Sequence, residues 1–354
     1  MLKSWERVFK EETIYRNSIN PDTLCNYEIT CLDEPLSCIM PNDLVVIGAD
    51  SGVGKSTLIL NMVRQNVSSG KRVILFYLEG GEQEAIQRMK WADICKIYFH
   101  NQDYRNFGIN MLYSDWVTNR IFDPRKILSK IEGEVYDKYE ASYKDNLKIC
   151  SITKDFTIDD LMTGLMDCHR LVEKEGSFEA MSTFDADLVI IDHLQYFSLV
   201  GNESEIAQTT GILRECKNIS DKYRLPVILV SHLRKKEKDR GLPSQEDFYG
   251  SSNIPKISSV GITITQDYEK QNFRTGLYPT YFRIVKSRTG IPPNIAMRAC
   301  FDKDTQVYED YYDIYKVNTR GVPDTDPMED SEKPTWAKRK EEKIPERSWD
   351  DQDS

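Results

Sequence analysis

Residues 48–57, GADSGVGKST, decide the fold, and the sequence on either side of them explains why. The apolar run LVVI (44–47) precedes them, and the helix-forming run LILNMVRQNV (58–67) follows. A glycine-rich loop between a buried strand and a helix binds phosphate, because loop N–H groups and the helix N-terminus converge on the anion. Ala49 stands at the first glycine of the strict pattern GxxxxGK[ST]. The predicted nucleotide-binding residues are Ala49, Asp50, Ser51, Gly52, Val53, Gly54, Lys55, Ser56 and Thr57.

Short apolar or β-branched runs recur along the rest of the chain and are typical of strands buried on both faces. They lie at 44–47, 73–78, 188–191, 227–230, 260–265 and 281–285. Helical patterns separate most of the earlier runs, so we expect an α/β fold with a mainly parallel, twisted sheet flanked by helices. We divide the chain into a helix and lead-in (1–28), a main domain (29–320) with a helical insertion (about 91–147), and a charged tail (321–354). The tail is almost free of aliphatic residues, which predicts disorder.

Bulk properties exclude several classes of protein. The chain has no apolar run of about 18 residues, and its N-terminus is charged throughout, so we expect an intracellular protein without a membrane span. Its eight cysteines form no CxxC pair, which favours reduced thiols over zinc sites. The formal charge is −10, which leaves nucleic-acid binding open because a groove can be locally basic.

Polar residues follow three of the predicted strands, at the sheet edge where ligands bind in such folds. Asp192 ends the run 188–191, where a carboxylate suits the magnesium shell, although Asp also begins helices well. Glu79 follows 73–78 and could orient or deprotonate the attacking water; a glutamate there is also common on plain surfaces. His232 follows 227–230 and could sense the γ-phosphate, with a structural histidine as the equal alternative.

Together, in order, these segments resemble the ATPase domain of the hexameric replicative helicases of superfamily 4, which have a RecA-like fold. These are the DnaB family with its phage and mitochondrial (Twinkle) relatives, and the resemblance runs from about residue 29 to 310. MPNDLVVIGADSGVGKST (40–57) resembles the first motif, which commonly begins with alanine. VILFYLEGGEQEAIQRM (73–89) resembles the second and implies that Glu79 is the catalytic base and that Arg88 stacks on adenine.

The remaining motifs imply further roles. LVIIDHLQYF (188–197) resembles the third motif, with Ser56 and Asp192 on Mg²⁺ and Gln195 after them. VILVSHLRK (227–235) resembles the fourth, with His232 as in phage and mitochondrial members. FRIVKSRTG (282–290) resembles the last, in which Lys286 and Arg288 reach the γ-phosphate bound by the neighbouring subunit. Without the other segments, an exposed basic turn would be a better interpretation of KSR (286–288) than a contact with the neighbour's nucleotide.

The resemblance implies a nucleic-acid interface as well. PSQEDFYGSSNI (243–254) resembles the DNA-contacting region, although Tyr249 stands where relatives often have a basic residue. Backbone N–H groups there could still bind phosphate, and the preceding basic run could line a ring's channel or be a solvated loop. The candidate DNA contacts are Arg234, Lys235, Lys236, Gly250, Ser251, Ser252 and Asn253.

The resemblance therefore implies an ATP-dependent DNA helicase that uses ATP and Mg²⁺ and moves on single-stranded DNA as a ring, as a hexamer. About 40 residues precede the phosphate-loop strand, so we expect no primase segment. A separate primase or loader protein is an expected partner, and the helix at residues 2–15 is expected to pack on the adjacent subunit. The alternative is a RecA-like ATPase that binds nucleic acid or a protein as a switch without unwinding.

Overall fold

The computed structural model describes residues 3–50, 52–151, 155–173, 180–198, 204–234, 241–249, 253–267 and 276–337. Its centre is a nine-stranded sheet in the order β11-β10-β9-β8-β1-β7-β6-β2-β3. The strands are β1 (Leu44–Ala49), β2 (Val73–Tyr77), β3 (Leu147–Cys150), β6 (Leu188–Asp192), β7 (Val227–His232), β8 (Val260–Gln266), β9 (Leu277–Lys286), β10 (Ile295–Asp302) and β11 (Val307–Lys316). β8, β1, β7, β6, β2 and β3 run parallel, whereas β9, β10 and β11 are antiparallel.

The predicted α/β class and all six predicted strands are confirmed. Sequence reasoning missed β3, β10 and β11, and also the separate hairpin of β4 (His169–Glu173) and β5 (Ala180–Phe184). β10 and β11 mix charged and tyrosine residues with apolar ones, so they lack the continuous apolar run of a strand that is buried on both faces. They form an antiparallel extension of the sheet.

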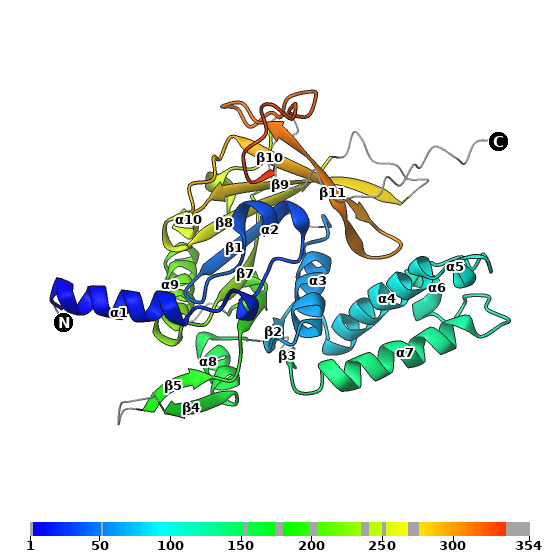
Figure 1. Cartoon of the computed structure of the whole chain (residues 1–354), viewed down its shortest axis with the longest axis horizontal. Coiled ribbons are helices and arrows are strands. Elements are labelled where there is room, and N and C mark those ends of the chain that lie inside the picture. Colours follow the sequence, from blue (N-terminus) through cyan, green and yellow to red (C-terminus); the bar gives the residue numbers. More distant parts are fainter. Residues whose placement is uncertain are drawn as a thin grey trace.

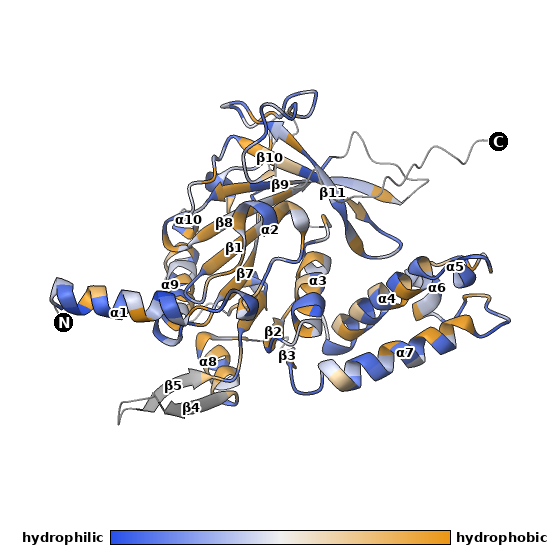
Figure 2. Cartoon of the chain, viewed as in Figure 1, coloured by the Kyte–Doolittle hydropathy of each residue, from blue (hydrophilic) through white to orange (hydrophobic). Residues whose placement is uncertain are grey.

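Helices cover both faces of the sheet (Figure 1). They are α1 (Trp5–Ser18), α2 (Thr30–Leu36), α3 (Lys55–Ser68), α4 (Glu82–His100), α5 (Gln102–Arg105), α6 (Tyr113–Val117), α7 (Ile127–Ser142), α8 (Ile158–Met166), α9 (Glu205–Tyr223) and α10 (Ile254–Ile257). Alternate residues of β1 belong to two core clusters: one contains α3 and α2, the other α8 and α9. The central strands are predominantly hydrophobic (Figure 2).

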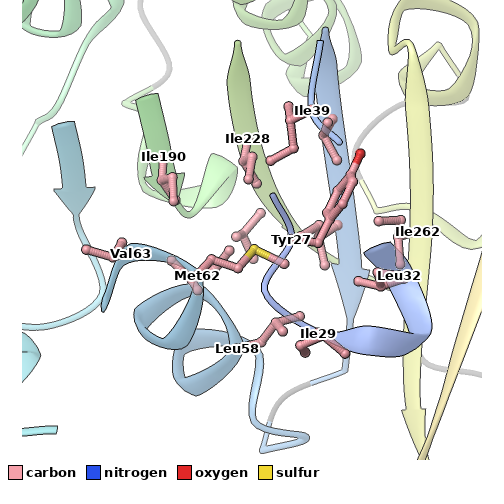
Figure 3. Close-up of a cluster of buried hydrophobic side chains, with 14 of the residues drawn as sticks. Tyr27, Ile29, Leu32, Ile39, Leu58, Met62, Val63, Ile190, Ile228 and Ile262 are labelled. Carbon is pink, nitrogen blue, oxygen red and sulfur yellow. The ribbon is translucent and has the colours of Figure 1, made fainter. Parts of the chain in front are cut away.

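The lead-in before β1 belongs to this core. Figure 3 shows Tyr27 and Ile39 beside Met62 of α3 and Ile228 of β7. Cys25 and Tyr27 are 2% and 0% exposed, so buried core residues lie on the N-terminal side of the division predicted at residue 28. Their burial fixes the segment that leads from α1 to the sheet.

Two segments extend from the body of the molecule (Figure 1). The predicted helical insertion is an arm, residues 82–142, made of α4, α5, α6 and α7 and holding its own apolar cluster around Trp91 and Ile131. It begins earlier than predicted, because α4 starts at Glu82. The other segment is α1, which has no buried residue and exposes Trp5 and Phe9.

The prediction of disorder is wrong for the first part of the tail, residues 321–337. Residues 321–337 lie against the sheet, where the Met328 N–H donates to the Ile314 carbonyl of β11 at 2.7 Å. Trp336 and Ala337 pack on the main core cluster. These few apolar side chains are enough to hold the segment in place; residues 338–354 lie outside the described residues. None of the helices in the described part of the chain has the length and apolar composition needed to cross a bilayer.

Candidate nucleotide site

The predicted phosphate loop connects the end of β1 to the start of α3. Gly52 and Gly54 have φ of 82° and 86°, left-handed values that favour glycine, and Gly54 is the residue that precedes α3. A Cβ on Gly54 would also approach the Tyr308 hydroxyl to 3.2 Å. Lys55 and Thr57 are buried at the start of α3, whose free N–H groups point out of its N-terminus. Ser51 lies outside the described residues.

A pocket of about 570 Å³ opens over this loop. It is lined by Gly52, Gly54, Lys55, Ser56, Thr57, Tyr77, Glu79, Gly80, Glu84, Arg88, Gln266, Tyr278, Phe301, Lys303 and Gln306. Gly52, Gly54, Lys55, Ser56, Thr57, Glu79 and Arg88 were predicted from the sequence, whereas Tyr77, Gly80 and Glu84 of the same region were not. The last five lining residues come from β8, β9, β10 and the β10–β11 turn and were also missed, because nothing in their local sequence is typical of a nucleotide site.

Asp192 ends β6 as a fully buried carboxylate, 0% exposed. Neither of its oxygens has a hydrogen-bond partner among the described residues. Burial raises its pKa from 3.8 to about 6, and the nearby Ser56 hydroxyl and Lys55 ammonium oppose this rise. An uncompensated buried carboxylate is costly, and a divalent cation is the partner that would offset the cost. Asp192 and Ser56 therefore fit Mg²⁺, whose preferred ligands are oxygens.

Glu79 lies two residues after the end of β2, beside Ser56. The Ser56 hydroxyl donates to Glu79 Oε2 at 3.4 Å, and the Glu79 side chain is 42% exposed. His193 Nε2 lies 3.7 Å from the same carboxylate oxygen. Glu79 thus borders the pocket with one oxygen held near the phosphate loop, which is where a base for water attack is required.

His193 was not predicted, yet it lies at the centre of a polar network behind the pocket. Gln195 Oε1 accepts from the His232 backbone N–H at 3.2 Å, and Gln195 Nε2 donates to Ser231 Oγ at 3.1 Å. His193 Nδ1 is 3.1 Å from Gln195 Oε1 and must therefore be the protonated ring nitrogen. Burial lowers the pKa of His193 to about 3, with further contributions from His232 and Lys55, so the ring is neutral.

His232 connects this network to the phosphate loop. Its Nδ1 is 3.3 Å from Lys55 Nζ, and its ring centroid is 4.3 Å from that of His193. Burial and the Lys55 charge lower its pKa. The predicted γ-phosphate sensor therefore lies beside the lysine predicted to bind that phosphate.

Arg88 lies on α4 at the pocket wall. Its guanidinium pairs with Glu84 at 2.8 Å and lies 5.9 Å from the centre of the Tyr113 ring. Tyr278, Phe301 and Lys303 also line the pocket. The β10–β11 turn is joined to α3, since Thr57 Oγ1 donates to Gln306 Oε1 at 3.3 Å. Aromatic and guanidinium groups of this kind suit the stacking of a nucleobase. Arg88 remains the residue predicted to stack on adenine.

Lys286 and Arg288 do not line this pocket. Tyr278, near the start of β9, borders the pocket, whereas Lys286 ends the strand eight residues later. At about 3.3 Å per residue this separation is about 26 Å. Lys286 pairs with Gly261 near the beginning of β8, at the edge of the sheet where the parallel strands start. Arg288 is exposed just beyond it.

Two of the predicted DNA contacts and the neighbouring Tyr249 lie in the described part of the chain. Arg234 is exposed, and its N–H donates to the Asp247 carbonyl at 2.7 Å. Asn253 Nδ2 donates to Thr210 Oγ1 of α9 at 3.2 Å. Tyr249 is 43% exposed, and its N–H donates to the His232 carbonyl at 3.0 Å. The remaining predicted contacts lie outside the described residues: Lys235, Lys236, Gly250, Ser251 and Ser252.

All eight cysteines are free thiols in the structure. The described residues contain no group of three or more His, Cys, Asp or Glu side chains that could hold a metal ion by themselves. This is compatible with the magnesium prediction, because such sites use few protein ligands and complete the shell with phosphate and water.

Similar proteins have been described. Replicative DNA helicase DnaB of Leifsonia xyli subsp. xyli is 25% identical over 253 residues, which are 70% of this chain and 48% of that protein. Replicative DNA helicase DnaC of Bacillus subtilis is 24% identical over 270 residues, 74% of this chain and 51% of that protein. The chain thus spans about half the length of the curated relatives it matches.

Solved structures share the fold. One of them, the isolated ATPase domain of another protein, superposes with a TM-score of 0.66 at 16% identity, covering 88% of this chain and all of that one. A DnaB-like replicative helicase, solved in a study of its interactions with primase, gives a TM-score of 0.64 at 16% identity, covering 87% and 67%. The sequence pattern of the DnaB-like helicase C-terminal domain matches residues 26–310. The chain therefore belongs to the DnaB-like helicase C-terminal domain family.

Proposed function

We propose that this chain is the motor of an ATP-dependent DNA helicase of the replicative type, moving on single-stranded DNA as a homo-oligomeric ring. One observation carries the proposal. Lys55, Ser56, Glu79 and Arg88 line one pocket, and the buried carboxylate of Asp192 lies beside Ser56. Arg288, in contrast, is exposed just beyond the far end of β9. Such a site is complete only when a second copy supplies its arginine.

The chain's own residues have distinct tasks in hydrolysis. The N–H groups of the loop at Gly52 and Gly54 and the Lys55 ammonium bind the phosphates. Asp192 and Ser56 would hold Mg²⁺, which supplies positive charge beside the phosphates. Glu79 orients the attacking water and accepts its proton, while the neutral His193 and the Gln195 amide keep this side of the pocket in a fixed arrangement.

Two features support a ring. Lys286 lies about 26 Å along β9 from Tyr278 of its own nucleotide pocket, and Arg288 lies two residues further on, so a neighbouring subunit's nucleotide is the proposed target of both. An arginine added in this way stabilises transition-state charge and makes hydrolysis depend on assembly. The exposed apolar side chains of α1, among them Trp5 and Phe9, suit packing on an adjacent copy. We propose a hexamer, as the family resemblance implies.

The link to DNA runs through β7. The Tyr249 N–H bonds the carbonyl of His232, so the predicted γ-phosphate sensor and the predicted DNA segment are joined by a backbone hydrogen bond. The relatives named above are replicative DNA helicases, which supports single-stranded DNA as the ligand. A primase or loader protein is the proposed partner, and the proposed location is intracellular.

DNA-stimulated ATPase activity tests the proposal, together with oligomeric mass and the unwinding of a forked duplex. We expect single-stranded DNA to stimulate turnover and the fork to open. Lys55→Ala should abolish turnover, and Arg288→Ala should abolish it while leaving nucleotide binding to the isolated chain intact. ATP turnover that does not respond to DNA would refute the helicase and favour the alternative, a RecA-like switch or assembly factor that does not unwind.

A further inference from the structure

Lys286 is held by backbone carbonyls of its own chain. It is the last residue of β9 and lies opposite Gly261 of β8. Its ammonium donates to the carbonyls of Pro255 and Ser258 and to that of Lys256 at 3.2 Å. An ammonium has three N–H donors, so these three acceptors use all of them. The side chain has no donor left for a phosphate in this arrangement.

The three carbonyls belong to the C-terminal end of α10 and the residue after it. Such carbonyls have no partner within the helix, and Lys286 satisfies them. α10 has only four residues, too few to be stable by itself. The buried Ile254, which belongs to the same core cluster as α9, and Lys286 at the other end therefore hold it in place.

This short helix joins the predicted DNA segment to the sheet. Asn253, a candidate DNA contact, is the residue that precedes α10, and β8 begins two residues after Ser258. The position of α10 therefore sets the C-terminal end of the segment that is predicted to contact DNA. Lys286 holds α10 without touching that segment.

A neighbour's nucleotide would compete with α10 for Lys286. A phosphate oxygen carries negative charge and forms a stronger hydrogen bond with an ammonium than a neutral carbonyl does. Arg288, two residues on, faces solvent and would meet the same phosphate. Binding of Lys286 to that phosphate requires that it release at least one α10 carbonyl.

We propose that Lys286 is a coupling residue with two alternative positions, α10 of its own subunit and the nucleotide of the neighbouring subunit. Its transfer to the nucleotide releases the end of the DNA segment. The inference rests on the proposed ring. It adds a route by which nucleotide bound to one subunit changes the DNA contact of the next subunit. A coupling of this kind is reciprocal, so DNA binding shifts nucleotide affinity by the same factor.

Hydrogen exchange across residues 253–259 of the full chain tests both positions. Without nucleotide, Lys286→Met should accelerate exchange there by about tenfold, because α10 loses its C-terminal partner. Lys256→Met is the matched control: it removes an exposed cation of α10 but keeps the carbonyl, so exchange should not change. With a non-hydrolysable ATP analogue and Mg²⁺, exchange should rise in the wild type and stay constant in Lys286→Met.

Affinity for a labelled oligothymidylate supplies the functional readout. The analogue should change this affinity in the wild type, whereas the ratio with and without analogue should lie within about twofold of one in Lys286→Met. Lys286→Arg serves if the methionine variant does not fold. A planar guanidinium keeps the charge but cannot direct three donors to these carbonyls, so it should also accelerate exchange.

Two results would overturn the inference: equal exchange in Lys286→Met and wild type, or no effect of bound analogue on exchange in assembled wild-type rings. A chain that stays monomeric with analogue and DNA refutes the proposed ring and the second position of Lys286. In that case, hydrogen exchange of Lys286→Met and wild type without nucleotide still tests whether Lys286 holds α10 of its own subunit. An assembled ring that shows the exchange changes but no DNA affinity refutes the helicase and leaves the Lys286 transfer standing.

Discussion

Asp192→Asn in metal-free protein should raise stability, although Asp192 is a predicted magnesium ligand. The carboxylate is fully buried, without a partner among the described residues, and its pKa is raised from 3.8 to about 6. Two pKa units at about 1.36 kcal/mol each give about 3 kcal/mol of destabilisation. The neutral amide has nearly the same shape and removes this cost.

The dependence on pH follows from the sign of the shift. Because the folded-state pKa is the higher one, the cost is absent below about pH 4, grows as pH rises and is complete above about pH 6. The gain from Asp192→Asn should therefore be about 3 kcal/mol at pH 8 and about half of that at pH 5. For 354 residues, 3 kcal/mol corresponds to a rise in Tm of about 4 °C.

Thermal unfolding in EDTA at pH 8 and pH 5 measures this difference. The companion measurement adds MgATP at about 100 times its Kd, which should stabilise the wild type by about 2.7 kcal/mol and the variant much less. An Asp192→Asn protein that is no more stable than wild type in EDTA at pH 8 would show that the carboxylate is already compensated. The structural basis of the magnesium assignment would then fail.

Three further variants probe other parts of the molecule. Glu79→Gln should lower kcat by about 10²–10⁴-fold and keep nucleotide affinity, and a loss of affinity in nucleotide titrations would contradict its role as base. Asp93→Asn removes the partner of the buried Arg64 at 2.8 Å and should cost about 3–5 kcal/mol in denaturant unfolding, whereas a cost below about 1 kcal/mol would exclude a buried charge pair. Asp33→Asn should weaken the dependence of the free energy of unfolding on pH. Burial raises the pKa of Asp33 to about 7, so the wild type loses about 3 kcal/mol between pH 5 and pH 8; an unchanged profile in the variant would refute this.

The central half of the sheet could be predicted because its information is local. β1, β2, β6 and β7 are continuous apolar runs, and the polar residues that follow them lie at one edge by the geometry of parallel strands. Glu79 and Asp192 could thus be placed near the phosphate loop without coordinates. The prediction of a disordered tail failed for residues 321–337 because composition weighs the average of a segment, whereas Met328, Trp336 and Ala337 pack against the main core cluster.

The sequence by itself determined the phosphate loop, the parallel strands and the chemistry at their ends, since each is encoded within about 20 adjacent residues. Only the tertiary structure decided which distant side chains complete the site. Gln306 meets Thr57 across 249 residues of sequence because antiparallel β10 and β11 bring their turn back over α3. The same antiparallel path carries Lys286 away from its own nucleotide and onto α10. No local pattern encodes those encounters, because they depend on strand direction and register in the assembled sheet.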